Sequence, residues 1–200
     1  LFVSRTVAEN RMLYRRGGLF KNNFEMKIIF LDIDGVLNVI PQGRDEFGAK
    51  FHSHFENNLK HIIESTGAKI VISSTWRMDG LEKMQAMWKA RGLAGEVIDV
   101  TPDCTQLVKY GTFEYYDSVE RGHEIQDWID AHPEIISYVI IDDDKDMLAS
   151  QLERFVRTAN NKSHPDCVDI GYGLTKKCAE MAIEILNGKC LTEQTGSHAV

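Results

Sequence analysis

The stretch FLDIDGVLN (residues 30–38) ends an apolar segment with two carboxylates, Asp32 and Asp34, beside a glycine. In a β-strand, residues i and i+2 point to the same face, so this spacing predicts that the two acids lie side by side. Two negative charges that close repel each other unless a cation or a reaction requires them there. The stretch therefore predicts a functional site at the end of the first strand.

The rest of the chain alternates between strand-like and helix-like segments. Apolar, strand-like runs occur at 27–33, 69–74, 96–100, 137–144 and 154–158, and helical patterns at 55–67, 81–92, 123–133 and 176–188. Near-continuous apolar strands are typical of a sheet that is covered on both faces. The alternation predicts an α/β fold: a three-layer α/β/α, Rossmann-like domain with a mainly parallel central sheet.

Composition and charge narrow the class of protein. The chain has 200 residues, 43% of them hydrophobic, and a formal net charge of −7. This length fits one domain, and the acidic balance argues against a general nucleic-acid binder. The four cysteines form no C-x-x-C pair, and no apolar run is long enough to span a bilayer. We therefore expect a cytoplasmic protein with reduced thiols that does not bind membranes.

The first 25 residues differ from the rest of the chain. They lack clear periodicity and are rich in basic residues, and Met26 directly precedes the first strand. We expect residues 1–25 to be a non-native or disordered leader, residues 26–190 to form the domain, and residues 191–200 to be a C-terminal tail. A basic arm that contacts an anionic partner is the alternative interpretation of the leader.

Polar residues follow three of the predicted strands. Besides Asp32 and Asp34, a hydroxyl-rich group ends the strand at 69–74, and consecutive acids at 142–144 end the strand at 137–144. Ligands of parallel sheets bind outside the carboxyl ends of the strands, where these side chains are expected to meet. Oxygen ligands of this kind suit Mg²⁺, which also relieves the repulsion between the acids.

These residues resemble the motifs of the haloacid dehalogenase (HAD) superfamily of phosphohydrolases. DIDGV (32–36) resembles the first motif, VISS (71–74) the second and VIIDDDKD (139–146) the fourth. Arg121 lies 21 residues before Asp142 and fits the place of the third motif. D-x-D alone is a weak signal, but four motifs in the correct order are much more specific.

A closer resemblance extends to about Gly188. TGAKIVISSTWR (66–77), YVIIDDDKDM (138–147) and RFVRT (154–158) resemble the HAD domains of RNA-repair proteins of the Swiss army knife type. The chain departs from this subgroup at Ala159, where an Asp is expected, and at 160–172, which resembles an inserted loop. The departures leave the motifs intact but put substrate contacts from that loop in doubt.

The resemblance implies a HAD-like fold without a large cap domain and a two-step phosphoryl transfer. Asp32 would attack phosphorus to form an aspartyl-phosphate, and Asp34 would protonate the leaving group and then activate water. The implied ligands of Mg²⁺ are Asp32, the backbone carbonyl of Asp34, Asp142 and Asp143. The implied phosphate contacts are Gly35, Ser74 and Arg121.

Several assignments have alternatives. Ser73 is the alternative to Ser74, and Lys109 is the alternative to Arg121 as a phosphate contact. Arg77 either contacts the substrate or pairs with an acid of the fourth motif, and the structural pairing is the preferred interpretation.

Other residues have structural interpretations. His52 and His54 are interpreted as solvated loop histidines, since no third metal ligand is evident nearby. Trp76, Trp88 and Trp128 are interpreted as packing residues.

The sequence thus predicts a Mg²⁺-dependent phosphomonoester hydrolase. The expected partner is a phosphorylated substrate, with nucleotides or nucleic-acid ends as candidates, and no protein partner is evident. A non-catalytic module that binds Mg²⁺ and phosphate, or a phosphatase of small metabolites or phosphoproteins, is the alternative. The Tyr-rich stretch at 110–116 is a candidate lid over the site.

Overall fold

The computed structural model describes residues 26–39, 42–110, 112–159 and 172–188. The expected leader (1–25), the expected tail (191–200) and nearly all of the expected insertion (160–172) lie outside the described residues. Within the described part of the chain, no helix is long and apolar enough to cross a membrane.

A five-stranded parallel sheet forms the centre of the domain. Its strands lie in the order β5-β4-β1-β8-β9, and every neighbouring pair is parallel. The strands are β1 (Met26–Leu31), β4 (Lys69–Ile72), β5 (Val97–Val100), β8 (Ile135–Asp142) and β9 (Phe155–Arg157). This arrangement confirms the predicted α/β fold with a mainly parallel sheet. Chain order reverses on either side of β1, which is where such sheets bind ligands.

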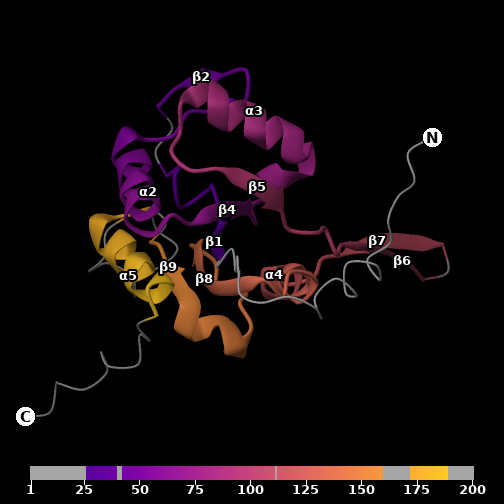
Figure 1. The fold of residues 1–200 in the computed structure, drawn as a ribbon. Helices are drawn as coiled ribbons and strands as arrows, with labels where there is room; N and C mark the ends of the chain where they lie inside the picture. The colour runs from indigo at the N-terminus through magenta and orange to yellow at the C-terminus, as the bar shows by residue number, and fades with distance from the viewer. Residues whose placement is uncertain (1–25, 40–41, 111, 160–171, 189–200) are drawn as a thin grey trace, which may run out of the picture.

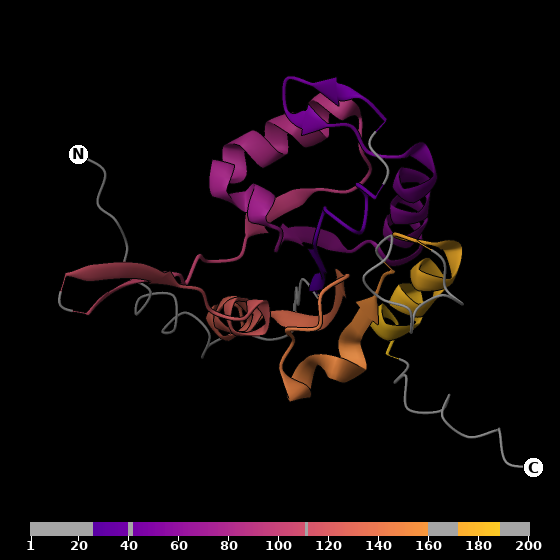
Figure 2. The same ribbon diagram turned by 180° about the vertical axis from the view of Figure 1, so that it is seen from behind.

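Helices cover both faces of the sheet (Figures 1 and 2). One face packs against α2 (Ser53–Thr66), α3 (Leu81–Arg91) and α5 (Lys176–Leu186), and this side holds the larger core cluster. The other face packs against α4 (Arg121–Ala131), where Ile125 and Trp128 contact Phe30 and its neighbours. Because the central strands β1, β4 and β8 are largely buried on both faces, their sequences are mostly apolar rather than alternating.

The predicted helix ends are confirmed where local chemistry determines them. Gly67 and Gly92 end α2 and α3 in the left-handed conformation that glycine adopts without strain. Thr175 begins α5, since its hydroxyl accepts a hydrogen bond from the backbone N–H of Cys178.

The periodicity of the sequence did not predict the shorter elements. They are the 3₁₀-helices η2 (Thr75–Asp79) and η3 (Ala149–Arg154), and the two-stranded sheets of β2 (Arg44–Asp45) with β3 (Gly48–Ala49) and β6 (Gln106–Tyr110) with β7 (Phe113–Asp117). The Tyr-rich stretch is therefore mostly β-hairpin rather than loop. In both ribbon views this hairpin projects away from the domain beyond α4 instead of folding over the sheet (Figures 1 and 2).

A buried ion pair ties η2 to α4. Arg77 Nη2 donates to Glu124 Oε2, and both side chains are more than nine-tenths buried. Arg77 Nη1 also donates to the backbone carbonyl of Ser73. The expected pairing of Arg77 with a fourth-motif acid is therefore wrong, because α4 brings Glu124 into its reach.

We expect Glu124→Gln to lower the free energy of unfolding by about 3 kcal/mol, because it leaves the Arg77 charge buried without its counter-charge. Denaturant unfolding measures this change. Asp79→Asn is the matched control: it removes the charge from the exposed Lys83–Asp79 pair and should cost less than about 1 kcal/mol. Equal effects of the two substitutions would contradict the structural role of the buried pair.

Candidate active site

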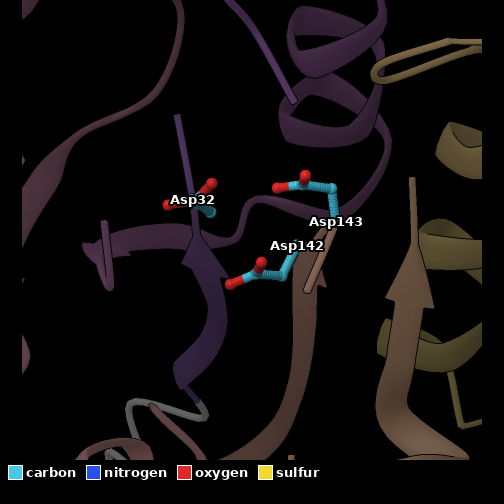
Figure 3. Close-up of side chains that lie close together, drawn as sticks. All are labelled: Asp32, Asp142 and Asp143. Carbon is cyan, nitrogen blue, oxygen red and sulfur yellow. The ribbon is translucent and has the colours of Figure 1, made fainter. Parts of the chain in front are cut away.

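Three carboxylates converge at the carboxyl ends of β1 and β8. Figure 3 shows Asp32 following β1, with Asp142 and Asp143 at the end of β8, and the three side chains close together. One carboxylate oxygen from each residue lies within 4.8 Å of the others, and all three residues are buried. Parallel pairing of the strands causes this, because the N–H of Asp32 donates to the carbonyl of Ile141, directly before Asp142, at 3.0 Å.

Arg121 lies between two of these acids. Its Nη1 donates to Asp32 Oδ1 at 2.6 Å and to Asp142 Oδ2 at 2.7 Å. The backbone N–H of Arg121 donates to Asp146 Oδ2, which fixes the first residue of α4 against the segment after β8. The structure therefore places Arg121 beside the acids, whereas the alternative Lys109 lies in the projecting β6.

Burial and charge oppose each other in this cluster. Burial raises the pKa of Asp32, and Arg121 and a hydrogen bond from Ser74 only partly offset that rise. Burial and the charge of Asp32 raise the pKa of Asp142 well above its usual range, although Arg121 lowers it. Burial lowers the pKa of Arg121, but the charges of Asp142 and Asp32 raise it more, so the guanidinium stays protonated. Arg121 thus does not cancel the rise in the pKa of Asp32 and Asp142, and a divalent metal ion beside them would stabilise their charged forms.

The donor set fits a divalent metal ion. All three groups are carboxylates, close enough for each to offer one oxygen to a common ion. Hard cations such as Mg²⁺ and Ca²⁺ prefer oxygen ligands of this kind. Among the described residues, no other group of His, Cys, Asp or Glu side chains meets the same geometric condition. His52 instead caps α2 by accepting from the N–H of His54.

The prediction that strand spacing sets Asp34 beside Asp32 does not apply, because neither acid lies within β1. Strand β1 ends at Leu31, and the chain then turns, with the N–H groups of Val36, Leu37 and Asn38 directed at the carbonyl of Ile33. The side chain of Asp34 is exposed and lies outside the buried cluster, so the acids have different surroundings. Its backbone carbonyl as a metal ligand stays a prediction.

Both the backbone conformation and the position of Asp143 require a glycine at residue 35. Its φ is +78°, and a Cβ built on it would lie 2.2 Å from Cγ of Asp143. A side chain here would both strain the backbone and displace one of the cluster acids. The carbonyl of Gly35 accepts from the hydroxyl of Thr158, which holds this turn against the chain that follows β9. A phosphate contact from Gly35 stays a prediction.

The two serines after β4 have different surroundings. Ser74 is buried, its side chain hydrogen-bonds to Asp32, and its Oγ accepts from the N–H of Trp76 at the start of η2. The Oγ of Ser73 is buried and has no hydrogen-bond partner among the described residues. The structure therefore brings Ser74, rather than Ser73, to the acid cluster, while its contact with phosphate stays a prediction.

The remaining acids after β8 do not cap a following helix. Asp144 donates its own backbone N–H to Asp142 Oδ1, and its side chain is exposed. Asp146 caps α4 instead, which comes earlier in the sequence. This long-range cap orients Arg121, and no local sequence signal indicates it.

Two residues at the site were not identified as functional from the sequence. Trp76 Nε1 donates to Asp34 Oδ2 at 2.9 Å, and Asn38 Nδ2 donates to Asp34 Oδ1 at 2.6 Å. Trp76 also packs against Phe51, as expected for a packing residue, but its indole N–H faces the candidate acid–base group. Trp88 and Trp128 are core residues, as interpreted from the sequence.

A solved structure described as a HAD superfamily (subfamily III A) hydrolase from Legionella pneumophila matches with a TM-score of 0.38 and 14% identity, over 82% of this chain and 85% of that chain. A search of curated proteins found no match.

The family comparison covers the part of the chain that contains the acid cluster. The sequence profile of the family described as "HAD domain in Swiss Army Knife RNA repair proteins" matches residues 28–163. The matched region contains Asp32, Ser74, Arg121, Asp142 and Asp143. The chain therefore belongs to the family of HAD domains found in Swiss Army Knife RNA repair proteins.

Proposed function

We propose that this HAD-family hydrolase domain is a Mg²⁺-dependent phosphomonoesterase that uses Asp32 as its nucleophile. The observation that carries the proposal is the buried cluster of Asp32, Asp142 and Asp143 with Arg121 against two of them. Burying carboxylates this close together is costly for a purely structural site, and perturbed carboxylates such as Asp32 and Asp142 gather at catalytic centres.

Asp32, Asp142 and Asp143 would hold the metal ion. When bound, Mg²⁺ would offset the repulsion between an anionic phosphate and the carboxylates. Mg²⁺ prefers oxygen ligands and tends to keep bound water, and both properties suit a site with three carboxylates at the carboxyl ends of two strands.

The protein side chains would divide the two steps between them. In the first step, a carboxylate oxygen of Asp32 bonds to phosphorus, the bond to the leaving oxygen breaks, and Asp34 gives its proton to that oxygen. In the second step, Asp34 takes a proton from water, whose oxygen displaces the Asp32 carboxylate from phosphorus. Phosphate leaves, and both acids return to their starting states.

Ser74, Arg121 and Gly35 would contact the phosphoryl group. Ser74 and Arg121 both already hydrogen-bond to Asp32, so their donors surround the point of attack. Donors fixed before the substrate arrives stabilise developing charge without reorganisation during the reaction. The guanidinium would then exchange part of its contact with the acids for phosphoryl oxygens.

The proposed substrates are nucleotides or phosphorylated nucleic-acid ends. The family description names RNA repair proteins, and the hairpin of β6 and β7, which lies between the second and third motifs, does not fold over the sheet (Figure 1). Without a lid from this hairpin, the site would admit a phosphate at the end of a long molecule. The net charge of −7 predicts that such recognition depends on the end rather than on sequence-independent binding of the strand. Small metabolites and phosphoproteins are the alternative substrates.

The proposal includes a cytoplasmic location. Among the described residues, Cys104 and Cys178 form no disulfide, which is typical of a reducing compartment.

We expect purified protein to release p-nitrophenol from p-nitrophenyl phosphate with Mg²⁺ and to stop with EDTA. Asp32→Asn should lower kcat by at least about 10³-fold, since the amide cannot form the aspartyl-phosphate. Trapping of ³²P on the wild-type protein, but not on Asp32→Asn, would support the covalent step. Turnover that survives Asp32→Asn would contradict the role of Asp32, and Mg²⁺ binding without any turnover would favour the non-catalytic module.

Metal binding can be measured apart from activity. Mg²⁺ at 100 times its dissociation constant should stabilise the protein by about 2.7 kcal/mol, or about 5 to 10 °C in Tm. Asp142→Asn should remove most of this shift, because it keeps the shape of a cluster ligand but not its charge. Asp144→Asn is the matched control: the residue is exposed and outside the cluster, so the shift should persist. An unchanged shift in Asp142→Asn would place the metal elsewhere.

A further inference from the structure

The carboxylate of Asp34 is held by two donors from different parts of the chain. Asn38 Nδ2 lies 2.6 Å from Oδ1, and Trp76 Nε1 lies 2.9 Å from Oδ2. Asn38 belongs to the same turn as Asp34, whereas Trp76 belongs to η2, which follows β4, the strand beside β1. An exposed carboxylate ordinarily rotates among several rotamers, but donors on both oxygens select one orientation.

Packing fixes the indole that supplies the second donor. The Trp76 ring lies 5.8 Å from the ring of Phe51, centroid to centroid. On another side, a Cβ added to Gly48 of β3 would lie 3.3 Å from Cη2 of Trp76, so the backbone of the β2–β3 hairpin lies close to the ring. The indole N–H is therefore a donor whose position the surrounding structure sets, rather than one that follows the carboxylate.

The turn fixes the first donor. The N–H of Asn38 donates to the carbonyl of Ile33, and the carbonyl of Asn38 accepts from the N–H of Gly35. These bonds place the Asn38 side chain beside Asp34, which lies between Ile33 and Gly35 in the chain. The Oδ1 of Asn38 is buried and has no hydrogen-bond partner among the described residues. The Asn38 side chain thus acts at this position as a hydrogen-bond donor, through Nδ2.

The same segment serves both acids of the D-x-D pair. Ser74 hydrogen-bonds to Asp32, and Trp76, two residues later, donates to Asp34. The N–H of Trp76 donates to Ser74 Oγ at 3.5 Å, so the two contacts share one local turn. The start of η2 therefore fixes the relative placement of the two carboxylates that strand spacing alone does not set.

We propose that Trp76 and Asn38 form a donor clamp that orients Asp34 for proton transfer at the leaving oxygen. The proposal rests on the proposed phosphatase function and deepens it. Trp76 and Asn38 are positioning residues: they neither attack phosphorus nor carry the transferred proton. The proton moves from Asp34 to the leaving oxygen as the phosphorus–oxygen bond breaks, and the clamp keeps the carboxyl O–H of Asp34 aimed at that oxygen.

Leaving groups of different acidity test the clamp. p-Nitrophenolate leaves without much help, whereas the alkoxide of benzyl phosphate needs a proton in the transition state. We expect Trp76→Phe, which keeps an aromatic ring, to lower kcat/KM for benzyl phosphate about tenfold more than for p-nitrophenyl phosphate. Asn38→Ala should act in the same direction. Asp34→Asn sets the upper limit of the effect, on the order of 10² to 10⁴ for benzyl phosphate.

Trp88→Phe is the matched control. Trp88 also packs against Phe51, and its replacement also removes an indole hydrogen bond, but that bond goes to the carbonyl of Ala94 and not to Asp34. The ratio of the two kcat/KM values should stay at the wild-type value in this variant. Equal loss on both esters in Trp76→Phe would reduce Trp76 to a structural residue and overturn the proposal.

The indole N–H signals give a test that does not depend on turnover. The chain has three tryptophans, so an NMR spectrum of ¹⁵N-labelled protein shows three indole signals, and Trp76→Phe identifies one of them. Asp34→Ala should shift the Trp76 signal and speed its exchange with solvent, while the Trp88 signal stays in place. An unchanged Trp76 signal would overturn the clamp. If the wild type hydrolyses neither ester, the proposed function fails, and these signals still decide whether the clamp exists.

Discussion

The site depends on the parallel pairing of β1 with β8, which forces buried carboxylates together. Once the N–H of Asp32 donates to the carbonyl of Ile141, Asp32 and Asp142 must end their strands side by side. Burial then raises the pKa of both acids, and Arg121 supplies the only cation that the described residues place against them. A fold that sequesters this much negative charge gives up stability, and a bound metal ion would return it.

Helix α4 is positioned by contacts that lie outside the acid cluster. The buried pair of Arg77 and Glu124 joins it to η2, and Asp146 caps its first turn. Gln151 adds a further bond, from its Nε2 to the carbonyl of Gly122. These contacts come from both sides of β1 in the sheet order. Their combined effect is to hold the guanidinium of Arg121 at the one place where it balances Asp32.

The two acids of the D-x-D pair differ in burial, because the strand ends just before them and the chain then turns. Asp32 enters the buried cluster, whereas Asp34 lies on the exposed turn and is held by Asn38 and Trp76. A nucleophile benefits from a desolvated, charge-balanced position, and a group that exchanges protons with water benefits from access to solvent. The separation thus matches the two roles proposed for them, and Gly35 makes it possible by leaving room for Asp143.

The sequence by itself determined the α/β class, the five parallel strands, several helix ends and the acids that meet at the strand ends. These follow from local patterns: apolar runs, glycine and threonine at helix termini, and the order of the motifs. Only the tertiary structure decided that Asp34 lies on a turn beyond the strand, that Arg77 pairs with Glu124, that Asp146 caps an earlier helix and that Trp76 reaches Asp34. The turn that carries Asp34 is local, but its hydrogen bonds follow no periodic pattern. The other three contacts join residues far apart in the chain, and hydrogen-bond geometry between distant segments leaves no periodic signal in a sequence.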